Sequence, residues 1–171
     1  MRGLQVFYPD EEQQSAYGID YEKLYREGYR GIIFDIDNTL VRHNADSDAQ
    51  SRALFRRLKQ IGFAVCLLSN NKAARVERFN RPEPVETICK ANKPSRRGYR
   101  EAMRKMKTTP ETTVFVGDQL FTDIWGARRA GIRSILVSPI NPKEEIQIVL
   151  KRKLEWFVLR RYRRNKNKSK G

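Results

Sequence analysis

Ten residues carry the strongest structural signal in this chain: Gly31-Ile32-Ile33-Phe34-Asp35-Ile36-Asp37-Asn38-Thr39-Leu40. The first four form an unbroken apolar run, which is typical of a strand buried on both faces of a parallel sheet. Asp35 and Asp37 follow at the carboxyl end, where the binding crevice of such a sheet opens. Residues i and i+2 of an extended segment point the same way, so we expect both carboxylates to face one site. Two carboxylates at such a short distance repel each other, unless a cation lies between them or one of them is protonated.

Strand-like and helix-like segments alternate along the rest of the chain. Short apolar runs predict strands over residues 29–34, 63–68, 85–89, 112–116 and 134–137. Helical spacing of apolar residues predicts helices that begin after Asp20, at Ala49, near Ala73, after Pro94, near Thr122 and near Lys143. This alternation predicts an α/β fold with a three-layer, Rossmann-like parallel sheet and helices on both faces.

Four polar clusters follow four of the predicted strands. They are Asp35-x-Asp37-Asn38-Thr39, Ser69-Asn70, Lys93, and Gly117-Asp118 with Asp123. The carboxyl ends of the strands in an open α/β sheet converge on one crevice, so we expect the clusters to meet there. Together they contain the groups that phosphoryl transfer requires.

Each cluster suits one part of that chemistry. Asp35 can attack phosphorus as a nucleophile, and Asp37 can protonate the leaving oxygen and then activate water. Lys93 supplies a fixed cation for the charge on the phosphoryl oxygens. Donors to those oxygens are expected from Thr39, Ser69 and Asn70; a role of Ser69 and Asn70 as a helix cap only is the less favoured alternative. Carboxylates of Asp118 and Asp123, with Asp35 and the backbone carbonyl of Asp37, would form an oxygen-rich Mg²⁺ site.

This ordered set resembles the haloacid-dehalogenase-like (HAD) superfamily, whose four motifs it matches over roughly residues 30–140. The resemblance implies that Asp35 forms an aspartyl-phosphate, that Asp37 is the general acid and base, and that Mg²⁺ is the cofactor. It implies metal binding by Asp35, Asp37 and Asp118, whereas direct contact of Asp123 with the metal is left open. An aspartate at position 37 favours a phosphatase over the dehalogenases of the superfamily.

Further short sequence motifs resemble one particular branch of this superfamily. Ala91-Asn92-Lys93-Pro94 and the segment from Gly117 to Asp123 are similar to subclass IIIA of the superfamily. Pro9-Asp10, Ile19-Asp20-Tyr21 and the basic C-terminal segment resemble the bacterial YqeG-type proteins. Those are related to mitochondrial phosphatases of phosphatidylglycerophosphate. The implied reaction is hydrolysis of phosphatidylglycerophosphate to phosphatidylglycerol.

The spacing between the motifs leaves no room for a cap domain. One helix fits between Leu40 and the second strand, and one short helix with one strand fits between Asn71 and Lys93. We therefore expect a site open to solvent, which suits a phosphate carried on a lipid headgroup, a protein or a nucleic-acid end. With 171 residues the chain fits one domain. We predict a capless domain over residues 1–162, including a basic amphipathic helix, and a disordered basic tail over residues 163–171.

Positive charge is concentrated near the C-terminus. The chain has a net charge of +15, and residues 151–171 contain ten Lys or Arg and one acid, Glu155. Such a basic segment is expected to bind a polyanion. Two kinds of partner remain as alternatives: the anionic surface of a membrane, or RNA. The alternative function is accordingly an RNA- or ribosome-associated HAD-fold protein, or a phosphatase of another macromolecular or soluble phosphate.

The cysteines and the absence of a recognisable targeting segment indicate the cellular compartment. Cys66 and Cys89 lack metal-ligand spacing and are expected to be reduced thiols. We see no signal peptide and no apolar run long enough to span a bilayer. The expectation is a cytoplasmic protein with a peripheral contact at the inner face of the membrane. The sequence does not indicate an oligomeric state.

Overall fold

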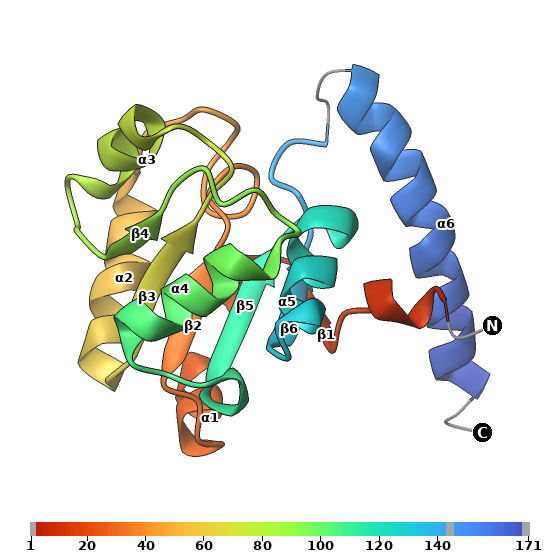
Figure 1. The fold of residues 1–171 in the computed structure, drawn as a ribbon, viewed down its shortest axis with the longest axis horizontal. Helices are drawn as coiled ribbons and strands as arrows, with labels where there is room; N and C mark the ends of the chain where they lie inside the picture. The colour runs from red at the N-terminus through yellow and green to blue at the C-terminus, as the bar shows by residue number, and fades with distance from the viewer. Residues whose placement is uncertain (1–2, 143–145, 169–171) are drawn as a thin grey trace.

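The computed structural model describes residues 3–142 and 146–168. It contains six strands and six α-helices in the order shown in Figure 1. The strands are β1 (Glu11–Gln13), β2 (Gly31–Phe34), β3 (Ala64–Leu68), β4 (Glu86–Ile88), β5 (Thr113–Gly117) and β6 (Arg133–Val137). The α-helices are α1 (Tyr21–Arg26), α2 (Ala49–Ile61), α3 (Ala73–Asn80), α4 (Arg96–Met106), α5 (Trp125–Arg129) and α6 (Ile146–Lys168). Four short helical turns are η1 (Gln5–Phe7), η2 (Ala16–Gly18), η3 (Pro110–Thr112) and η4 (Leu120–Ile124).

All six strands form one parallel sheet in the order β1-β6-β5-β2-β3-β4. The five predicted strands are present, and β2 lies at the centre of the sheet between β3 and β5. Strand β1 is a short polar edge strand that the apolar pattern of the sequence does not predict. Its position is fixed by Asp10, whose carboxylate accepts hydrogen bonds from the Ser134 backbone N–H at 2.8 Å and the Ser134 hydroxyl at 2.9 Å.

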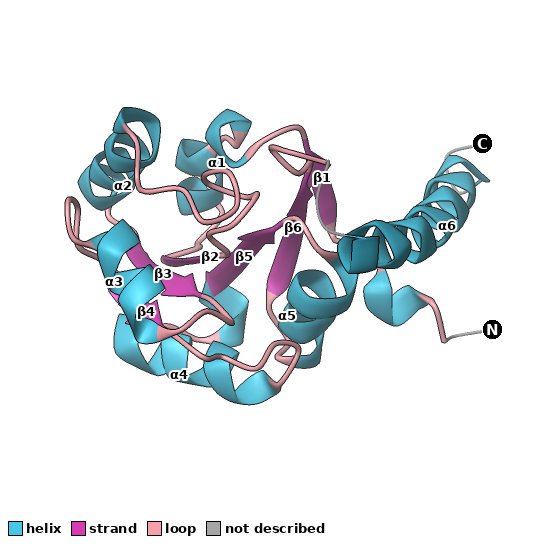
Figure 2. Cartoon of the chain, turned by 90° about the horizontal axis from the view of Figure 1, so that it is seen from above, coloured by secondary structure: helices cyan, strands magenta, loops and turns pink. Residues whose placement is uncertain are grey.

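Helices cover both faces of the sheet, as predicted. Figure 2 shows α1 and α2 on one side of the sheet and α4 and α5 on the other. Ile32 and Phe34 of β2 pack with the helices of the first side, whereas Ile33 packs with Tyr99 and Met103 of α4 on the second. Successive side chains of a strand point to opposite faces. The unbroken apolar run of β2 therefore supplies buried side chains to both faces of the sheet.

Helix α6 lies outside the central layers, beyond the β1 edge of the sheet and beside the N-terminal η1 (Figure 1). Val158 is buried against Leu120, Ile124 and Leu136. Leu154 falls on one helical arc with Ile146, Val149 and Leu150, which predicts that it packs on the domain, but its side chain is 60% exposed. The side chain of Phe157 is 61% exposed. The side chains of Ile146, Val149 and Leu150 are not among those that the structure describes, and the predicted start of the helix near Lys143 lies outside the described residues.

The end of α6 also differs from the prediction. A disordered tail was expected from Arg163, but the helix continues to Lys168. Two contacts hold this segment: the ring of Tyr162 lies 4.9 Å from the ring of Tyr8, and Arg163 pairs with Glu12 at 2.7 Å. Lysine and arginine are also good helix formers. A basic composition therefore did not require disorder here. None of the described helices is both long enough and apolar enough to cross a membrane.

Candidate active site

The four polar clusters meet at the carboxyl edge of the sheet. Asp35 follows β2, Asp118 follows β5, and both are buried. Asp123 lies in η4 and is also buried. One carboxylate oxygen from each of these three residues lies within 4.8 Å of the others. We call Asp35, Asp118 and Asp123 the acidic triad.

Lys93 is inserted between two members of the triad. Its Nζ lies 2.6 Å from Asp35 Oδ1 and 2.7 Å from Asp123 Oδ1. Burial opposes the charge of Lys93, but the two carboxylates outweigh it and raise the pKa of the ammonium. Three carboxylates and one ammonium leave an excess of negative charge, which a divalent cation would offset. The oxygen-only donor set suits such a cation.

The electrostatics of Asp35 differ from those of an exposed aspartate. Burial raises the pKa of Asp35 to about 7, and the Asp123 carboxylate acts in the same direction, while Lys93 opposes both. Thr39 Oγ1 lies 3.3 Å from Asp35 Oδ2 and 3.3 Å from Asp118 Oδ1. Its single proton can serve only one of these oxygens at a time. Thr39 therefore lies between two acids, a position from which it could also contact a phosphoryl oxygen.

Two local features bring Asp123 into the site. The segment Leu120–Ile124 forms a π-helical turn, where a regular α-helix from about Thr122 was predicted. Asp123 Oδ2 accepts a hydrogen bond from the Gln119 backbone N–H at 3.1 Å. A Cβ at Gly117 would lie 2.6 Å from Asp123 Oδ2. Glycine at 117 therefore permits the close approach of this carboxylate, and π-helical turns are frequent at functional sites.

Ser69 and Asn70 organise the neighbouring loops. The Asn70 side-chain oxygen accepts a hydrogen bond from the Lys93 backbone N–H at 2.7 Å. Ser69 is buried, and its Oγ accepts from the Asn71 backbone N–H at 3.1 Å. Asn70 thus ties the loop that carries Lys93 to the end of β3. This role adds to the predicted phosphate contact, which stays a prediction for Thr39, Ser69, Asn70 and Lys93.

Asp37 is held apart from the acidic triad. Its Oδ1 accepts from the Asn44 backbone N–H at 2.7 Å and from Arg75 Nη2 at 3.0 Å, and Asn71 Nδ2 donates to its other oxygen. Burial opposes ionisation, but these donors outweigh it and hold the pKa of Asp37 below its usual range. The Asp37 carboxylate is therefore not a member of the triad, and metal contact through its backbone carbonyl stays a prediction.

Arg75 and Asn71 contact Asp37 but are not among the site residues predicted from the sequence. Arg75 lies on α3, is buried, and has Phe79 within 5.7 Å of its guanidinium carbon. A charged residue on the inner side of a predicted helix, next to Val76 and Phe79, was the available signal, because buried arginines are almost always paired. Asn71 directly follows the second motif and could have been included with it.

Neither possible insertion point holds a cap domain in the described structure. Residues 35–48 connect β2 directly to α2, and residues 69–95 contain only α3 and β4 between β3 and α4. The carboxyl edge of the sheet is consequently not covered by an inserted domain.

A parallel sheet with these clusters at its carboxyl edge defines a HAD-like hydrolase. The HAD-hydrolase-like family model matches residues 90–145. "Probable phosphatase YqeG" of Bacillus subtilis is 36% identical over 155 residues, which cover 90% of each protein. The chain therefore belongs to the HAD-type phosphatases and, within them, to the family of YqeG.

More distant proteins share parts of the chain or its fold. Phosphatidylglycerophosphate phosphatase 1 of Arabidopsis thaliana, a chloroplastic and mitochondrial protein, is 30% identical over 85% of this chain and 45% of its own length. The cobalt-bound deoxy-D-mannose-octulosonate 8-phosphate phosphatase YrbI of Haemophilus influenzae has a TM-score of 0.53 and 16% identity, covering 67% of this chain and 70% of its own. A haloacid dehalogenase-like hydrolase of Bacteroides fragilis has a TM-score of 0.53 and 17% identity, covering 70% of this chain and 93% of its own. These two structures show the likeness of the fold.

Proposed function

We propose that this chain is a Mg²⁺-dependent phosphomonoesterase that works through an aspartyl-phosphate. The surroundings of Asp35 support the proposal most strongly. One oxygen of its buried carboxylate contacts Lys93, and the other lies within hydrogen-bond distance of Thr39. A carboxylate oriented in this way can attack a phosphorus atom whose oxygens are stabilised by Lys93.

The proposed reaction has two displacements. Asp35 attacks phosphorus, the bond from phosphorus to the leaving oxygen breaks, and Asp37 transfers its proton to that oxygen. Water then attacks the aspartyl-phosphate, Asp37 takes the proton of the water, and inorganic phosphate leaves with Asp35 restored. Lys93 remains beside the phosphoryl oxygens in both steps, and donors from Thr39, Ser69 and Asn70 orient them.

The acidic triad is the proposed metal site. Asp35, Asp118 and Asp123 would hold the cation together with the backbone carbonyl of Asp37. Mg²⁺ is proposed because the triad offers only hard oxygen ligands. Bound there, the cation would neutralise charge on the phosphoryl oxygens.

Phosphatidylglycerophosphate is the proposed substrate, with phosphatidylglycerol as the product. The partial similarity to the Arabidopsis phosphatase supports this choice. An uncapped sheet edge also suits a phosphate that is attached to a large object, because a small metabolite would be poorly enclosed.

The metal requirement can be tested with phosphatidylglycerophosphate in mixed micelles. Phosphate release should require Mg²⁺, fall about 100-fold or more with EDTA, and return when Mg²⁺ is added in excess of the chelator. Release that persists in EDTA would reject the metal requirement. If a generic aryl phosphate is hydrolysed but this lipid is not, the proposed phosphomonoesterase reaction is retained and phosphatidylglycerophosphate is rejected as the substrate.

A peripheral contact of α6 with an anionic membrane surface is part of the proposal. Lys153, Arg160 and Arg164 are exposed on α6, and the apolar side chain of Leu154 is exposed among them. Basic residues near an anionic bilayer each contribute about 1 kcal/mol to binding. The same charges could instead meet the RNA backbone.

Sedimentation distinguishes these partners. The protein should sediment with vesicles that contain anionic phospholipid, and much less with neutral vesicles or in high salt. Reversal of Lys153, Arg160 and Arg164 to glutamate should abolish this sedimentation. Sedimentation with ribosomes but not with anionic vesicles would reject the membrane contact and favour the RNA-linked alternative.

A further inference from the structure

Helix α6 buries one carboxylate beside the reaction centre. Glu155 is only 6% exposed, although it belongs to a helix that lies outside the central layers of the fold. Its Oε1 accepts a hydrogen bond from the Leu120 backbone N–H at 3.0 Å. Burial of an ionised carboxylate costs free energy unless hydrogen bonds compensate for it. We therefore expect this contact to matter to the protein, yet none of the proposed reaction steps uses Glu155.

The hydrogen bond of Glu155 serves the turn that carries Asp123. Leu120 is the first residue of η4, and the backbone N–H groups at the start of a helical turn have no partner within that turn. The preceding N–H, that of Gln119, donates to Asp123 Oδ2 at 3.1 Å. Two carboxylates, one from the turn itself and one from α6, therefore hold the two backbone groups at which η4 begins.

Apolar packing connects the same helix to the same turn. Val158 follows Glu155 by three residues, so both side chains lie on one face of α6. Val158 is buried in one apolar cluster with Leu120 and Ile124, the first and last residues of η4. The inner face of α6 thus packs on η4, and the hydrogen bond of Glu155 adds a directional contact to this packing.

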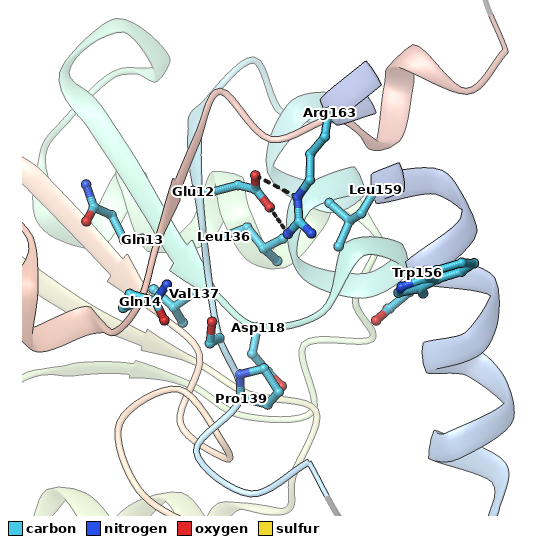
Figure 3. Close-up of a pocket in the computed structure, with 12 residues that line it drawn as sticks. Glu12, Gln13, Gln14, Asp118, Leu136, Val137, Pro139, Trp156, Leu159 and Arg163 are labelled. Carbon is cyan, nitrogen blue, oxygen red and sulfur yellow. Dashed lines mark hydrogen bonds and ion pairs between the residues drawn. The ribbon is translucent and has the colours of Figure 1, made fainter. Parts of the chain in front are cut away.

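The turn η4 places one carboxylate of the acidic triad. Asp123 is fully buried, and its Oδ1 lies 2.7 Å from Lys93 Nζ. Figure 3 shows Asp118, another member of the triad, across from Trp156 and Leu159 of α6. Mg²⁺ requires a nearly ideal arrangement of its oxygen ligands. A small displacement of η4 would therefore weaken a metal site built from this triad.

We propose that Glu155 is a positioning residue of the metal site: it holds the backbone of Leu120 and thereby fixes η4 and the carboxylate of Asp123. This inference rests on the proposed function, because it concerns the metal site assigned there to the acidic triad. Groups that orient metal ligands from outside the ligand shell typically contribute about 10 to 100-fold to metal affinity. Glu155 acts through the backbone of the turn, so we expect an effect at the lower end of this range.

The test measures Mg²⁺ binding directly, in the absence of substrate. Metal-free protein is titrated with Mg²⁺ in an isothermal calorimeter, which gives a dissociation constant and a number of sites. Glu155→Ala should raise the dissociation constant about tenfold, because the acceptor for the Leu120 N–H is lost. Glu155→Gln keeps an acceptor oxygen at this place, so its dissociation constant should stay within about threefold of the wild-type value.

Glu12→Gln is the matched control. Glu12 also holds α6, because it pairs with Arg163 at 2.7 Å, but this solvent-exposed pair joins the helix to β1 rather than to η4 (Figure 3). The substitution therefore loosens the same helix without removing the contact to the turn. Since exposed ion pairs contribute little, the Mg²⁺ dissociation constant of this variant should remain within about twofold of the wild-type value.

Turnover of an aryl phosphate gives a second readout, which separates positioning from a general loss of structure. The loss of rate in Glu155→Ala should be overcome by excess Mg²⁺. The Mg²⁺ concentration that gives half of the maximal rate should rise by the same factor as the dissociation constant. A variant that had merely lost folded protein would instead show fewer binding sites and a lower maximal rate, with both Mg²⁺ constants unchanged.

An unchanged dissociation constant in Glu155→Ala, with or without fewer sites, would overturn the inference and leave the proposed function intact. Equal weakening by Glu155→Gln and Glu155→Ala would overturn it as well, because the charge rather than the hydrogen bond would then carry the effect. If the wild type hydrolyses aryl phosphate without binding Mg²⁺, the proposed metal site fails and the inference fails with it. If the wild type hydrolyses no phosphomonoester, the phosphatase activity is rejected, and the calorimetric comparison still decides the role of Glu155.

Discussion

Asp35→Asn is expected to reduce phosphate release to about one thousandth of the wild-type rate or less. An amide is a far weaker nucleophile than a carboxylate, so the proposed aspartyl-phosphate cannot form. The change also removes one member of the acidic triad and weakens the proposed metal site. Both effects act on the chemical step, and the loss should appear with any phosphomonoester.

The fold should tolerate this substitution. Asparagine has the shape of aspartate, and its side-chain oxygen can still accept from Lys93. Burial already raises the pKa of Asp35 to about 7, so a neutral side chain is compatible with this position. Circular dichroism and thermal unfolding of Asp35→Asn should therefore remain close to those of the wild type.

Asp46→Asn provides the matched control. Asp46 is an exposed aspartate whose side chain is 69% accessible and pairs with Arg78 on the surface. Its substitution should leave phosphate release within about twofold of the wild type, since exposed ion pairs contribute little. If Asp35→Asn retains Mg²⁺-dependent turnover within tenfold of the wild type, the covalent route is wrong. A different nucleophile would then have to be sought.

The fold and the meeting of the polar clusters could be predicted because each depends on a strong local signal. The runs at Ile32–Phe34 and Val114–Val116 are apolar without alternation, which only a strand covered on both faces requires. Parallel strands all end at one edge, so residues as distant in sequence as Asp35 and Asp118 had to approach one another. No side-chain geometry was needed for that inference.

The remaining features depend on contacts that no local pattern encodes. Strand β1 is polar, and it is fixed by hydrogen bonds of Asp10 with Ser134 rather than by apolar burial. On α6, the buried residues Val158 and Tyr162 form a narrow strip, while the larger apolar side chain of Phe157 is exposed. A helix with apolar residues around most of its circumference does not reveal which side meets the domain. The side of α6 that packs on the domain was accordingly not predictable from the sequence.

Asp37→Asn is the second substitution with a large expected effect, and that effect should depend on the leaving group. General acid catalysis contributes about 10² to 10⁴-fold when the leaving oxygen must be protonated. An alkyl phosphate, whose leaving alkoxide is strongly basic, should therefore lose about that factor. An aryl phosphate leaves as a weakly basic phenolate, so its first displacement should be affected much less.

The second displacement gives an independent signature. Without the carboxylate of Asp37, no general base activates the water that attacks the aspartyl-phosphate. An aryl phosphate should then release about one equivalent of phenol per enzyme rapidly, followed by slow turnover. Rapid mixing measures this burst, and Asp35→Asn should show none. Equal losses with alkyl and aryl substrates, without a burst, would contradict the role of Asp37 as acid and base.

Arg75→Met tests how the protein sets the proton affinity of Asp37. Arg75 Nη2 donates to Asp37 Oδ1 at 3.0 Å, while Arg75 Nε and Nη1 are buried without a hydrogen-bond partner among the described residues. Methionine removes the cation and leaves no buried donor behind. The pKa of Asp37, which Arg75 helps to hold below its usual range, should therefore rise.

A higher pKa of Asp37 should shift the pH dependence of kcat/KM in a defined direction. Asp37 must be protonated to deliver a proton, and in Arg75→Met the protonated form persists to higher pH. The alkaline fall of kcat/KM for an alkyl phosphate should consequently move to higher pH, whereas an aryl phosphate should show little change in this limb. Arg75→Lys keeps the positive charge and should keep the limb closer to its wild-type position. A purely structural role for Arg75 would lower the rate at every pH without moving the limb, and that result would leave the tuning of Asp37 to Asn44 and Asn71.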